Sequence, residues 1–175
     1  MTAKQNGKAS IRTVQLEDAP ALLALLREIV EEGEYFIAVS EEFNKTLQQQ
    51  EDSIQHVLEN EGQAMLVAEW DGVVVGSIAF SSQNRKRTSH TGSITMMIQK
   101  EYRNRGLGKL LLQELLDWAK QHPHIEKVSL GVFSTNHRAI ALYKSMGFEE
   151  EGRKVKEFKR SDDDYIDDIL MCKFV

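Results

Sequence analysis

The feature that most constrains this chain is a basic turn with two glycines, RNRGLG, at residues 103–108. An apolar run at residues 93–98 precedes it and is typical of a strand, whereas residues 107 to about 120 have the apolar stripe of a long helix. Glycine allows a backbone to turn tightly and to approach a ligand closely. The first N–H groups of the helix and the positive end of its dipole then face the turn, which predicts a site for a phosphate or pyrophosphate group.

Two familiar phosphate-binding motifs do not fit this turn. The P-loop needs G-x-x-x-x-G-K-[ST], but here Gly108 and Lys109 are followed by Leu110, and Arg103 stands five residues before Gly108. The dinucleotide fingerprint G-x-G-x-x-G fails as well, because its third glycine position is Leu111. The remaining pattern is R-x-x-G-x-G, which also suits a turn that only caps the helix.

A second pattern occupies residues 132–148. Asn136 can cap a helix, and Gly147 can supply the left-handed position that ends it. The helix between them has one apolar side, formed by Ala139, Ile140, Tyr143 and Met146. Together with Gly147-Phe148 and the R-x-x-G-x-G turn, this pattern resembles the two hallmark motifs of the GNAT superfamily of N-acetyltransferases. The resemblance covers roughly residues 63–150.

The resemblance implies acetyl-CoA as the cofactor and transfer of its acetyl group to a primary amine by direct attack. Backbone N–H groups of the turn would bind the pyrophosphate, and the strand before it would pair with the pantetheine arm and supply an oxyanion donor near Met97 or Ile98. The implied cofactor-binding residues are Met96, Met97, Ile98, Arg103, Asn104, Arg105, Gly106, Leu107, Gly108, Lys109 and Asn136. Tyr143 matches the family tyrosine that protonates the departing thiolate, and a phenol with a pKa of about 10 holds that proton at neutral pH.

The sequence leaves the general base open. Some relatives carry a glutamate at the position that matches Gly131, and glycine cannot act as a base, although it can open space for a substrate. The other candidates are Glu32, Glu34, His90 and Glu101, and a chain of water molecules would also serve. The missing glutamate favours an alternative function, a catalytically silent acyl-CoA-binding or regulatory module of the same fold.

The acceptor is expected near an acidic segment that follows the first helix. Its glutamates are Glu28, Glu31, Glu32, Glu34, Glu41 and Glu42. An acidic wall suits a cationic amine, but an acidic protein would also carry such residues in a solvated loop. The expected acceptor-side residues are Glu32, Glu34, Tyr35 and Gly131. The acceptor itself stays open between a small cationic amine or polyamine and a protein N-terminal amine.

Composition excludes several classes of protein and partner. The 175 residues suit a polar tail at residues 1–9 and a single domain at residues 10–175. A net charge of −5 argues against a nucleic-acid partner, and no apolar run approaches the ~20 residues that span a membrane. The lone Cys172 excludes an intrachain disulfide and fits a cytoplasmic location. No third ligand accompanies His122 and His124, so no metal is expected, and a homodimer is left open.

The order of the expected elements indicates an α/β fold of the α+β type. Strands are predicted at residues 11–14, 64–70, 73–81, 93–98, 127–133, 150–158 and 165–174, and helices from residue 18 and at 53–60, 107–120 and 136–146. Asp71-Gly72 is a strong signal for a two-residue hairpin turn. The resemblance implies a mixed, largely antiparallel twisted sheet of about 6–7 strands with helices on both faces.

Overall fold

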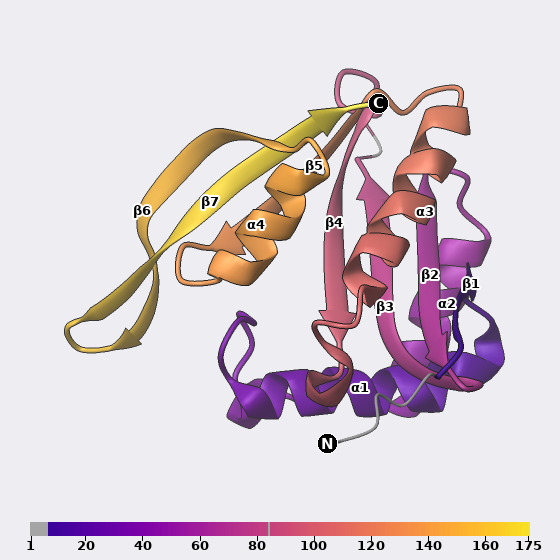
Figure 1. Ribbon diagram of the computed structural model, residues 1–175, viewed down its shortest axis with the longest axis horizontal. Helices are drawn as coiled ribbons and strands as arrows, with labels where there is room; N and C mark the ends of the chain where they lie inside the picture. The colour runs from indigo at the N-terminus through magenta and orange to yellow at the C-terminus, as the bar shows by residue number, and fades with distance from the viewer. Residues whose placement is uncertain (1–6, 84) are drawn as a thin grey trace.

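The structure is a computed structural model that describes residues 7–83 and 85–175. Within these residues a seven-stranded sheet runs through the molecule, with helices on both of its faces (Figure 1). The strands are β1 (Ala9–Thr13), β2 (Gln63–Trp70), β3 (Val73–Ser82), β4 (Thr91–Ile98), β5 (Lys127–Phe133), β6 (Glu149–Ser161) and β7 (Asp164–Phe174). The helices are α1 (Ala19–Glu32), α2 (Leu47–Leu58), α3 (Leu107–Gln121) and α4 (His137–Ser145), with short 3-10 turns η1 (Leu16–Asp18), η2 (Ser40–Glu42) and η3 (Lys100–Tyr102). None of the described helices is long and apolar enough to cross a membrane.

The sheet opens between its two central strands. The strand order is β1-β2-β3-β4-β5-β7-β6, and every neighbouring pair is antiparallel except β4 and β5. This parallel pair joins only Thr91–Ser93 to Lys127–Ser129, after which the two strands separate, as Figure 1 shows. From Ile94 to Ile98, β4 therefore has a strand partner only on its β3 side among the described residues. The prediction of a mixed, largely antiparallel sheet is confirmed, and the opening leaves backbone groups of β4 available on one edge.

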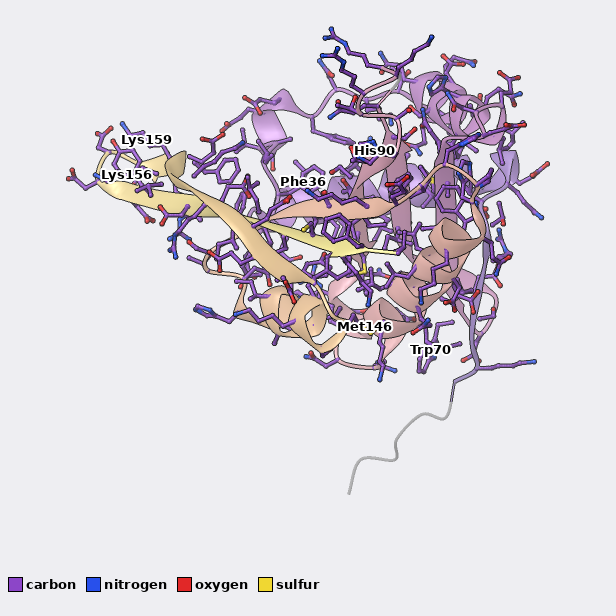
Figure 2. The ribbon with its side chains drawn as sticks, turned by 90° about the horizontal axis from the view of Figure 1, so that it is seen from above. Phe36, Trp70, His90, Met146, Lys156 and Lys159 are labelled. Carbon is purple, nitrogen blue, oxygen red and sulfur yellow. The ribbon has the colours of Figure 1, made fainter. Side chains whose placement is uncertain are left out.

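Side chains of β4 alternate between two cores. Met96 and Ile98 pack with the core under α3 and α4, whereas Met97 packs with the smaller core under α1 and α2. Figure 2 shows the two sides of the sheet, with Met146 and Trp70 on one side and Phe36 on the other. The methionines of β4 therefore fill both cores while their backbone borders the opening in the sheet.

The start of α1 differs from the prediction that Asp18 caps it. Pro20 does lie in the first turn, but the Asp18 side chain makes no cap hydrogen bond to the helix. Its carboxylate instead accepts hydrogen bonds from the Gln15 N–H at 2.8 Å and from the Arg12 guanidinium at 2.7 and 2.8 Å. The cation from β1 takes the carboxylate because a charge-assisted, bidentate pair is stronger than a single cap hydrogen bond.

Two further elements, α2 and β1, begin earlier in the sequence than predicted. The helix predicted at residues 53–60 is α2, which begins earlier because Thr46 and Gln49 form a capping box, with hydrogen bonds of 2.9 and 3.2 Å. Its first turn is polar, so an apolar stripe did not reveal it. The strand β1 begins at Ala9, inside the predicted tail, and residues 1–6 of that tail lie outside the described residues.

Candidate active site

A cavity of about 780 Å³ lies where β4 and β5 separate. One end, which we name the turn end, is lined by β4, by α4 and by the turn at residues 103–108. The other, the hairpin end, is lined by Gly131 and Phe133 of β5, Phe158 of β6 and Asp168 of β7. Residues 35–38, which follow α1, also line it. The volume is that of sites that enclose small-molecule ligands.

The turn end has the backbone geometry of an anion site. Asn104 and Gly106 both have left-handed conformations, with φ angles of 60° and 86°. Gly106 precedes the first residue of α3, no side chain caps the helix, and the Leu110 N–H makes the first bond back to the Gly106 carbonyl. The N–H groups of the first three helical residues consequently have no acceptor within the helix. They and the helix dipole favour a negatively charged group at this point.

Gly108 allows α3 to begin close to its neighbours. A Cβ atom at this position would lie 3.0 Å from Cδ2 of Leu142 and 3.4 Å from Cδ1 of Ile98. The first turn of α3 therefore lies directly against α4 and the end of β4. The two glycines of the predicted motif have different structural roles: Gly106 allows a left-handed turn, and Gly108 allows close packing.

The two arginines of the turn have different surroundings. The guanidinium of Arg103 forms an ion pair with Glu32 at the end of α1, and its Nε–H donates to the Ile98 carbonyl at 2.9 Å. Arg105 stacks over the rings of Trp70 and Tyr102, at 5.1 and 5.3 Å from their centroids. Arg103 therefore holds α1 to the turn. The prediction that either arginine contacts a phosphate group stays a prediction.

The expected acidic wall is not continuous along the cavity. Glu32 is paired with Arg103, whose hydrogen bond holds the pKa of that carboxyl below its usual value, and Glu28 accepts a hydrogen bond from Gln99 at 3.0 Å. Of the six glutamates that the sequence places in this region, Glu42 lines the cavity and Glu34 does not. Among the other expected acceptor-side residues, Tyr35 and Gly131 do line it.

Tyr143 and Asn136 line the cavity near α4. The Tyr143 side chain is 7% exposed, and burial raises the pKa of its phenol to about 12. The phenol therefore keeps its proton at neutral pH. The Asn136 side chain accepts a hydrogen bond from the Ala139 N–H at 3.2 Å, so its predicted role as helix cap is confirmed.

β5 has no acidic residue at the opening in the sheet, but an aspartate of β7 lies beside it. A Cβ atom on Gly131 would lie 2.7 Å from Oδ1 of Asp168, so the Asp168 side chain fills the space beside this glycine. Asp168 is buried, and burial raises the pKa of its carboxyl above the usual value. Our sequence analysis did not find this residue. The available signal was the alternation along β7, which places Asp168 on the same face as the buried Ile166.

Apolar side chains form much of the remaining wall of the hairpin end. The rings of Phe133 and Phe158 lie 4.5 Å apart, and Phe36 and Ile37 line the cavity from the segment after α1. Figure 2 shows Phe36 beside the strands on the side of the sheet away from Met146. This end therefore combines apolar walls with one buried carboxylate.

Comparison with known proteins identifies the class to which this fold and site belong. The acetyltransferase (GNAT) family matches residues 23–148. The L-amino acid N-acetyltransferase AaaT of Escherichia coli is 32% identical over 112 residues, which are 64% of this chain and 68% of that protein. An N-alpha-acetyltransferase of Sulfurisphaera tokodaii is 38% identical over 107 residues, and the match spans 55% of this chain and 62% of that protein.

Solved structures agree along almost the whole chain. An acetyltransferase of the GNAT family from Streptococcus pneumoniae has a TM-score of 0.91 and 28% identity, and the match covers 96% of this chain and 100% of that one. A ribosomal-protein-alanine N-acetyltransferase from Brucella melitensis has a TM-score of 0.84 and 26% identity, and the match covers 95% of this chain and 99% of that one. This chain belongs to the acetyltransferase (GNAT) family. It is an acetyl-CoA-dependent N-acetyltransferase, so the family, the reaction and the cofactor that the two motifs predicted are confirmed.

Proposed function

We propose that the acceptor is the α-amino group of an amino acid, or of a peptide whose first residue is apolar. The observation that carries this proposal is the composition of the hairpin end, where Phe36, Phe133 and Phe158 line the same cavity as the buried carboxylate of Asp168. A carboxylate suits the ammonium group of such a substrate, and apolar walls suit the side chain beside it. The acceptor's own carboxylate or peptide chain would then extend toward solvent.

Acetyl-CoA occupies the turn end in this proposal. Its pyrophosphate accepts hydrogen bonds from the turn at residues 103–108, and its pantetheine arm lies along the open edge of β4 between Met96 and Ile98. Tyr143 gives its proton to the thiolate as the thiolate leaves. Three observations on the described residues support these roles: N–H groups at the start of α3 that have no acceptor within the helix, the edge of β4 that has no strand partner on its β5 side, and the buried phenol.

The named relatives favour an α-amino group over a polyamine. Both the E. coli and the S. tokodaii relatives are named for acetylation of amino acids or N-termini, whereas a spermidine N(1)-acetyltransferase of Vibrio cholerae is 26% identical. A polyamine carries several charges and would need several carboxylates along its length. Only Glu42 and Asp168 are carboxylates of the described cavity wall, so we place polyamines second.

Location and assembly remain predictions. The lone Cys172, which is buried and unpaired with any second cysteine, supports a reducing cytoplasm. Dimer formation is open, and gel filtration with light scattering would measure it.

The test is release of the CoA thiol from acetyl-CoA across a panel of amines. The panel contains leucine, methionine and phenylalanine, peptides that begin with the same residues, glycine and serine peptides, spermidine and an aminoglycoside. We expect the highest kcat/KM with an apolar amino acid or N-terminus. A higher kcat/KM with spermidine than with every α-amine would overturn the acceptor proposal. Binding of acetyl-CoA without turnover on any amine would favour the silent acyl-CoA-binding module instead.

A further inference from the structure

The structure buries two aspartates, and they have opposite surroundings. Asp18 is 7% exposed, and the Arg12 guanidinium bound to it holds the pKa of its carboxyl below the usual value. Asp168 is 8% exposed, and burial raises the pKa of its carboxyl instead. Asp18 is therefore explained by its ion pair, whereas Asp168 requires a different explanation.

Among the described residues, Asp168 has only a long ion pair, with the half-exposed Lys154. No side chain of the described residues donates it a hydrogen bond, and the nearest cation, Nζ of Lys154, lies 3.8 Å from Oδ2 on a side chain that is half exposed. Lys154 and the Val132 backbone lower the pKa of the Asp168 carboxyl, and Glu157 raises it, but burial has the largest effect. A buried carboxylate with so little compensation costs stability. Such groups gather at functional sites.

The carboxylate and the phenol reach the cavity from opposite faces of the sheet. Leu130 and Val132 of β5 belong to the core under α4, together with Tyr143. Gly131 alternates with them, and the Asp168 oxygens lie beside it on the other face. A thioester held in the opening between β4 and β5 would thus have Tyr143 on one side and Asp168 on the other. Attack by an amine and departure of a thiolate need a base and an acid in such an arrangement.

We propose that Asp168 binds the acceptor ammonium group and is the general base of acetyl transfer. This inference rests on the proposed function and deepens it. The carboxylate takes one proton from the ammonium group, and the nitrogen lone pair then forms a bond to the thioester carbonyl carbon. As the C–S bond breaks, the thiolate takes a proton from Tyr143, which regains one from the new amide nitrogen. Asp168 finally releases its proton to solvent, so acetyl-CoA and an ammonium group give an amide, CoA and one proton.

The test compares Asp168→Asn with Asp167→Asn. Asp167 is the matched control because it precedes Asp168 in β7, pairs with Arg153 and does not line the cavity. With saturating acetyl-CoA and the best amine of the panel, we expect kcat of Asp168→Asn to fall by about 100-fold at pH 7. The KM for acetyl-CoA should not change, and Asp167→Asn should retain most of the wild-type activity.

The pH profile separates a base from a structural residue. The α-amine of a peptide has a pKa of about 8, so at high pH a peptide acceptor loses its proton without help. The activity of Asp168→Asn should therefore recover as pH rises from 7 to 9, while the wild-type rate levels off. The other titratable groups near the carboxylate or in the same cavity are Lys154, Glu157, Glu42, Tyr35, Tyr143, Arg103, Lys109 and Arg138, and they are present in both proteins.

Three results would overturn the inference: wild-type kcat in Asp168→Asn, a loss of the same factor at every pH, or an equal loss in Asp167→Asn. Thermal unfolding checks that the variant folds, and its Tm should equal or exceed the wild-type Tm because a buried charge has been removed. If the wild type itself releases no CoA with any amine, the proposed function fails. If the wild type turns over and Asp168→Asn matches it, only the role of Asp168 fails.

Discussion

The two ends of the cavity are built in different ways. The turn end comes mainly from one continuous stretch, the end of β4, the turn at residues 103–108 and the start of α3, to which α4 is added. The hairpin end is assembled from the segment after α1, from β5 and from the β6–β7 hairpin, which are three separate stretches of the sequence. The residues of the turn end form a local sequence motif. Those of the hairpin end come together only through strand pairing. Substitutions at each end of the cavity can test this difference.

Tyr143 should have the largest effect at the turn end. We expect Tyr143→Phe to lower kcat by about 100-fold, equivalent to about 2.7 kcal/mol, because the leaving thiolate loses its proton donor. Acetyl-CoA affinity, measured by calorimetry, should stay the same. Tyr35→Phe is the control, since Tyr35 lines the same cavity but is 40% exposed. A similar loss of kcat in both variants would contradict a specific role for Tyr143.

The pair between Glu32 and Arg103 should couple α1 to the turn end. Glu32→Ala leaves the guanidinium of Arg103 without its carboxylate at a site where the two side chains are 10% and 12% exposed. We expect the free energy of unfolding to fall by about 2 kcal/mol, together with weaker acetyl-CoA binding. Urea unfolding measures the first and calorimetry the second. Glu34→Ala, which removes a glutamate outside the cavity wall, should change neither quantity.

The same pair predicts a dependence of stability on pH. The pKa of Glu32 is lowered on folding, chiefly by the Arg103 hydrogen bond, so its contribution is present above the unfolded value of 4.5. The contribution is lost as pH falls through the lower, folded pKa. Urea unfolding between pH 3 and 7 should show the wild type and Glu32→Ala converging in stability at acid pH. A constant difference over that range would mean that the ion pair is not its source.

Gly131 should report on the hairpin end. In Gly131→Ala the new Cβ would lie 2.7 Å from Oδ1 of Asp168, so the carboxylate must move. We expect kcat to fall by about tenfold, less than in Asp168→Asn, since the base is displaced but still present. Combined with Asp168→Asn, the substitution should add little further loss, because both act on one group. Full additivity of the two losses would argue that Gly131 acts independently.

Gly106 should have the smallest effect, at the turn itself. Its φ of 86° disfavours any side chain, so Gly106→Ala should cost about 1 kcal/mol of stability or shift the turn, with weaker acetyl-CoA binding. Gly152→Ala is the control, because a Cβ there meets Leu170 only at an ordinary 3.6 Å. Thermal unfolding and calorimetry of the two variants would distinguish a conformational requirement at Gly106 from the effect of replacing any glycine by alanine.

Most of the fold and of the turn end was predictable because the signals are local. Hairpin residues Asp71-Gly72, the cap at Asn136 and the left-handed Gly147 each occupy the predicted position in the structure. Errors arose where a partner on another element decided the outcome. Asp18 binds Arg12 instead of capping α1, and the pairing of Glu32 with Arg103 was not predicted. Sequence spacing does not show which charged residue of another element will pair with a given carboxylate.

The sequence by itself determined the family, the order of elements and the conformation of the turn that we expect to bind a phosphate group. These follow from glycine conformation, helix caps and hydrophobic periodicity, which act over a few residues. Only the tertiary structure decided what the hairpin end contains. A glycine on β5 leaves a space, and antiparallel pairing with β7 brings the Asp168 carboxylate into it. That juxtaposition depends on register between strands that are distant in the chain, and no local pattern encodes it.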